Sequence, residues 1–155
     1  MNIPSKKNII EDFNSIIDME KVDFENVLSG YINYIDTLSE NREFREIIGG
    51  AGCEFLKQNI EILKINLQGK LSSKLLKEKK ANLWHLIDIS NSDSKKIVKL
   101  IVNGLTNKEN MLDYSNYPEY LSEDMLEISI STLYDLDWKY ANDFCFYLKE
   151  ILKDK

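Results

Sequence analysis

The sequence predicts an all-α protein, a single compact domain of six or seven helices arranged as a bundle or as stacked helical hairpins. Apolar residues recur at spacings of three and four along most of the chain, which is the period of an amphipathic helix. Two prolines and six glycines in 155 residues are too few for the many turns of an all-β fold. A chain of this length buries roughly 68–70% of its unfolded surface, so we expect one domain, residues 1–155, without disulfides or structural metal.

Three apolar stripes precede a glycine cluster in the first third of the chain. Asp23 is suited to cap the second helix, and Ser39 or Asn41 the third, because their side chains can accept hydrogen bonds from free N–H groups. The second stripe is the widest, so its helix is expected at the centre of the core. The apolar positions are Ile9, Ile10, Phe13, Ile16 and Ile17; Phe24, Val27, Leu28, Tyr31, Ile32, Ile35 and Leu38; and Phe44, Ile47 and Ile48, which are expected to face inward.

The glycine cluster at residues 49–52 places three glycines in four positions. In a helix interior each glycine costs up to ~1 kcal/mol relative to alanine. Either the helix breaks here, or another helix crosses closely over this bare surface. A phosphate-binding loop is disfavoured, because no strand pattern precedes the glycines and no Lys-Ser/Thr pair follows them. The helical stripe then resumes with Cys53, Leu56, Ile60, Leu63 and Leu67.

Two further helices are predicted between Gly69, which ends the preceding segment, and Gly104. Ser72 or Ser73 can begin the first of them. The polar run at residues 90–94 is the clearest boundary in the chain and separates the two. Their apolar positions are Leu75, Leu76, Leu83, Leu86 and Ile87, and then Ile97, Val98, Leu100, Ile101 and Leu105.

The helical period fails at about residues 106–121, which we expect to be a long irregular loop of the kind that is often functional. A helix should then begin at Ser122, with Met125, Ile128 and Leu133 facing inward. Residues 126–133 also alternate apolar and polar positions, so a strand is the alternative there, with helix favoured. Asp137 is suited to cap the last helix, whose stripe is Ala141, Phe144, Cys145, Leu148, Ile151 and Leu152.

The two cysteines, Cys53 and Cys145, stand among apolar residues of helical pattern, so we expect two buried, reduced thiols in a reducing compartment. The first seven residues have no apolar signal-peptide core, and no apolar run approaches the ~20 residues that span a bilayer. These observations predict a cytoplasmic protein that does not bind a membrane.

No constellation of residues predicts catalysis, a metal or another cofactor. His85 is the single histidine, three residues before Asp88, and no nucleophile is placed beside it, so we expect an ordinary, partly buried side chain. His85 and the two cysteines lack the ligand spacing of a zinc site. The acids form no EF-hand pattern, and one histidine cannot supply the paired Glu-x-x-His motifs of a di-metal bundle.

The net charge of −6 is spread unevenly. Residues 57–108 carry eleven lysines and four acids, whereas residues 109–148 carry nine acids and one lysine. Lys70, Lys74 and Lys77 are expected to share a helix face that could meet nucleic acid or an anionic membrane. Because the lysine segment has no arginine and almost no aromatic residue, and the chain as a whole is acidic, we expect a solvated face and no nucleic-acid partner.

The acidic stretch, residues 109–148, also holds six of the eight tyrosines. Carboxylates attract a basic partner at long range, and tyrosines supply rigid contact area. The loop and the start of the following helix are the favoured part, because the helical pattern does not require its acids and tyrosines. The alternative is that the tyrosines belong to the core and the acids are simply solvated. The predicted partner-binding residues are Asp113, Tyr114, Tyr117, Glu119, Tyr120, Glu123, Asp124 and Glu127.

The sequence therefore predicts a binding protein and not an enzyme. Its general character is similar to that of small acidic bacterial immunity proteins, which cover a toxin's active site with carboxylates that mimic its anionic substrate. By this analogy we expect an inhibitor that neutralises a basic toxin domain, such as a nuclease. The alternative is a helical adaptor or regulatory subunit that binds through an apolar groove near the glycine cluster. Charge reversal at Asp113, Glu119 and Glu123 separates the two hypotheses, because only the first depends on these acids.

Overall fold

The computed structural model describes residues 2–20, 24–89, 92–105 and 122–153, and all regular structure in these residues is α-helical. The helices are α1 (Lys6–Glu20), α2 (Phe24–Glu40), α3 (Arg42–Leu67), α4 (Ser73–Ile89), α5 (Ser92–Val102), α7 (Ser122–Leu136) and α8 (Trp138–Leu152). The all-α prediction is confirmed, and residues 126–133 belong to a helix and not to a strand. The loop predicted at about residues 106–121 lies outside the described residues.

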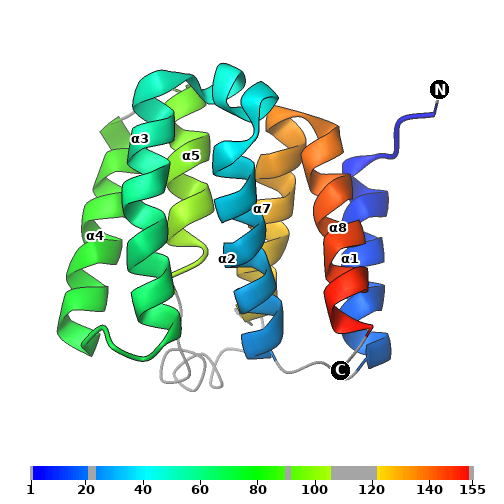
Figure 1. The fold of residues 1–155 in the computed structure, drawn as a ribbon, viewed down its shortest axis with the longest axis horizontal. Helices are drawn as coiled ribbons and strands as arrows, with labels where there is room; N and C mark the ends of the chain where they lie inside the picture. Colours follow the sequence, from blue (N-terminus) through cyan, green and yellow to red (C-terminus); the bar gives the residue numbers. More distant parts are fainter. Residues whose placement is uncertain (1, 21–23, 90–91, 106–121, 154–155) are drawn as a thin grey trace.

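The helices stand side by side in two layers with roughly aligned axes (Figure 1). One layer contains α3, α2 and α8, and the other contains α5, α7 and α1, with α4 packed beside α5 at one end. Helices α1 and α8, from opposite ends of the chain, pack against each other at the other end. The arrangement therefore puts the lysine-rich α4 far from α1 and α8.

The core is centred on α2, as its wide apolar stripe predicts. Tyr31 and Ile35 of α2 are fully buried, and so is Phe144 of α8. The Phe144 ring lies 5.7 Å from the ring of Tyr31, 5.2 Å from that of Tyr34 and 6.3 Å from that of Phe13, measured between centroids. This aromatic cluster joins α1, α2 and α8, and aromatic pairs of this kind add stability beyond the area that they bury.

Predicted polar residues begin several helices. Asn41 Oδ1 accepts a hydrogen bond from the Phe44 N–H at 2.9 Å and caps α3, and Asp137 Oδ1 accepts from the Lys139 N–H at 3.0 Å and caps α8. At α4, Ser72 Oγ accepts from the Leu75 N–H at 3.2 Å. These bonds satisfy N–H groups that have no partner inside the helix.

The glycine cluster combines both of the predicted alternatives. Gly49 has φ +78° and ψ 168°, a conformation that is essentially restricted to glycine, and it kinks α3. At Gly52, an added Cβ would lie 2.7 Å from Cδ1 of Ile97, so α5 crosses α3 closely at this position. The kink ends the short first part of α3, and at the crossing a Cβ on residue 52 would require the tip of the Ile97 side chain to shift.

Three expectations about individual faces are wrong. Ile47 is 43% exposed, because Phe44 and Ile48 occupy the inner side of the short segment before the kink. Ile128 is 50% exposed, because α7 buries the competing stripe that contains Leu126, four and seven residues before Ile130 and Leu133. A third correction concerns the lysines: α4 begins at Ser73, so the lysine at position 70 does not share its face.

Candidate protein-binding surface

The structure describes one end of the predicted partner-binding surface. Glu123 and Asp124 fall in the first turn of α7, and Glu127 follows one turn later. The remaining members, Asp113, Tyr114, Tyr117, Glu119 and Tyr120, lie outside the described residues. The predicted start of α7 at Ser122 is confirmed, so acids occupy the positive end of the helix dipole, where negative charge is favoured.

Glu127 is half-buried and held by a neighbouring helix. Its Oε1 accepts a hydrogen bond from Nδ2 of Asn14 on α1 at 2.7 Å. Because this partner is neutral, the bond fixes the position of the carboxylate without cancelling its charge. A charged group that is already ordered loses less side-chain entropy when a partner binds.

The second half of the acidic stretch serves the fold. Asp135 Oδ1 lies 2.7 Å from Nζ of Lys6, and Asp137 caps α8. Tyr140 is buried, and the hydroxyl of Tyr134 donates a hydrogen bond to the carbonyl oxygen of Pro4 at 3.0 Å. For this half, the interpretation of the tyrosines as structural residues is confirmed.

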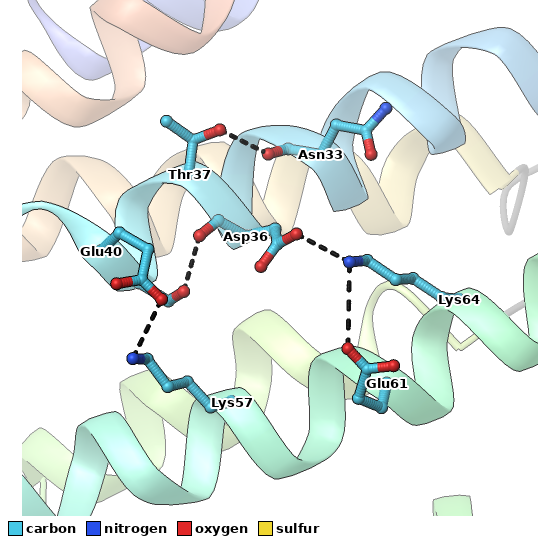
Figure 2. Close-up of polar contacts among 8 residues, drawn as sticks. Asn33, Asp36, Thr37, Glu40, Lys57, Glu61 and Lys64 are labelled. Atoms are coloured by element: carbon cyan, nitrogen blue, oxygen red, sulfur yellow. Dashed lines mark hydrogen bonds and ion pairs between the residues drawn. The ribbon is translucent and has the colours of Figure 1, made fainter.

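Ion pairs neutralise the acids between α2 and α3 (Figure 2). Nζ of Lys64 lies 2.7 Å from Oδ2 of Asp36 and 3.9 Å from Oε1 of Glu61, and Nζ of Lys57 lies 2.9 Å from Oε1 of Glu40. The hydrogen bond to Asp36 raises the pKa of Lys64. These two lysines of the lysine segment are therefore paired with acids of α2.

Several lysines of α4 and α5, unlike Lys57 and Lys64, lack ion-pair partners among the described residues. Lys74, Lys77 and Lys79 of α4, and Lys95 and Lys99 of α5, form no ion pair with another residue of the described part of the chain. Among the described residues, then, no lysine of the lysine segment pairs with an acid of the acidic stretch, whereas Lys6 and Lys139 pair with Asp135 and Asp137.

The two cysteines and the histidine lie in different environments. Cys53 and Cys145 are free and buried, as predicted, and burial raises the pKa of the Cys145 thiol to about 12, so it stays protonated at neutral pH. His85 is exposed on α4, which corrects the expectation of a partly buried side chain, because it lies opposite the buried stripe of that helix. Among the described residues, no three acidic, histidine or cysteine side chains converge as metal ligands would.

The chain matches no protein-family model, and neither the curated proteins nor the solved structures searched contain a match. In the described residues, each helix is too short or too polar to cross a bilayer.

Proposed function

We propose that this protein is a non-catalytic inhibitor that binds a basic protein partner through residues 113–127, in the manner of an immunity protein acting on a toxin domain. Its ligand would be a cationic surface, such as the substrate-binding face of a nuclease. The eight predicted residues would supply carboxylates for attraction and tyrosines for contact area.

The separation of charge between the acidic stretch and the lysine segment carries this proposal. Residues 109–148 hold nine acids against one lysine. The unpaired lysines of α4 lie at the end of the molecule away from α1 and α8 (Figure 1). Since opposite charges that do not pair within the molecule still act on other molecules, the acidic side can steer a cationic partner into contact.

The packing of α7, which carries Glu123, Asp124 and Glu127, supports the same proposal. Helix α7 packs against α5, α1 and α8, so the acids in its first two turns stand on an element fixed from three sides. Glu127 is held further by Asn14. A partner would therefore meet the Glu127 carboxylate in a fixed position, which lowers the entropic cost of binding it.

Binding to the basic protein domains that neighbouring genes encode would test the proposal. We expect tight binding whose association rate falls steeply with added salt. The triple variant Asp113→Lys, Glu119→Lys and Glu123→Lys should slow association by roughly a hundredfold. The control is Glu54→Lys, Glu78→Lys and Glu150→Lys, which makes the same change in net charge at exposed acids on α3, α4 and α8.

The control triple should slow association by no more than about threefold, because its acids are not among the eight proposed binding residues. Equal losses in the two triples would mean that net charge alone drives binding, and the proposed surface would be wrong. Unchanged binding in the first triple would favour an adaptor that recognises its partner by shape.

A further inference from the structure

We draw no further inference here: the strongest candidate, the apolar pocket of about 220 Å³ between α3, α4 and α5 that Phe55, Leu86 and Ile97 line, carries none, because nothing in the structure shows what covers it.

Discussion

Helices α8 and α4 have similar lengths of 15 and 17 residues, yet they are integrated into the fold to different degrees. Helix α8 packs against α1, α2 and α7, whereas α4 packs principally against α5. On α8, Lys139 and Lys149 pair with Glu43 and Asp12 of other helices, whereas Lys77 of α4 has no such partner among the described residues. The number of helices packed around a lysine, and not its residue type, therefore decides whether it forms an ion pair within the fold or remains available to a partner.

The same difference appears in the aromatic residues. Phe144 of α8 is fully buried and touches rings from two other helices, whereas Trp84 of α4 is 50% exposed. A helix with several neighbours orders its large side chains inside the core. A helix with one principal neighbour leaves them on the surface, where they can contact other molecules.

Truncation of these two aromatic side chains tests the difference between α8 and α4 most directly, and Phe144→Ala should have the largest effect on stability. Phe144→Ala removes the centre of the aromatic cluster and should lower the free energy of unfolding by about 3–5 kcal/mol. Trp84→Ala should change it by less than about 0.5 kcal/mol, since half of that side chain already faces solvent. Urea denaturation would measure both values. A loss at Trp84 comparable to that at Phe144 would show that α4 is as deeply integrated as α8.

The buried thiol of Cys145 on α8 makes the stability of the protein depend on pH. Burial raises the pKa of this thiol from 9.0 to about 12. Above pH 9 the unfolded chain therefore releases a proton that the folded chain keeps, so the stability contributed by this group is complete below pH 9 and is lost as pH rises toward 12. The expected slope approaches about 1.4 kcal/mol per pH unit in this window.

Tyrosine, whose ordinary pKa is about 10, also titrates between about pH 8.5 and 10, so the native chain is compared with a variant that changes only the thiol. The variant Cys145→Val keeps the apolar site but removes the titrating group, so its stability should vary less with pH than that of the native chain. The difference between the two chains is the quantity of interest. A constant difference across this range would contradict the buried, protonated thiol.

Much of the fold could be predicted because its signals are local. The caps at Asn41 and Asp137 and the buried cysteines follow from neighbouring residues, and all are present. The errors arise where two local patterns compete, as at Ile128, which belongs to a stripe that overlaps the one α7 buries. Only packing against other helices decides between two such stripes.

The candidate sites depended on long-range contacts and were less predictable. Lys6 and Asp135 are 129 residues apart in the sequence, so no local pattern predicts that Lys6 neutralises Asp135. The spacing of Phe55 and Ile62 was visible, but a space between α3 and α4 exists only because both helices lie over α5. The glycine cluster was the one local signal for the apolar pocket that Gly52, Phe55 and Leu86 line.

The smallest predicted effect concerns the lysines themselves. Lys149→Met removes the partner of Asp12, 3.2 Å away, and should lower stability by about 0.2–1 kcal/mol at low salt, as is typical of partly exposed pairs. The matched substitution Lys77→Met on α4 should leave stability within about 0.3 kcal/mol of the native value, because no ion pair with a described residue is lost. Added salt should shrink the first difference and leave the second unchanged. A larger loss at Lys77 would mean that this lysine stabilises the fold, and α4 would then not differ from α8 in this respect.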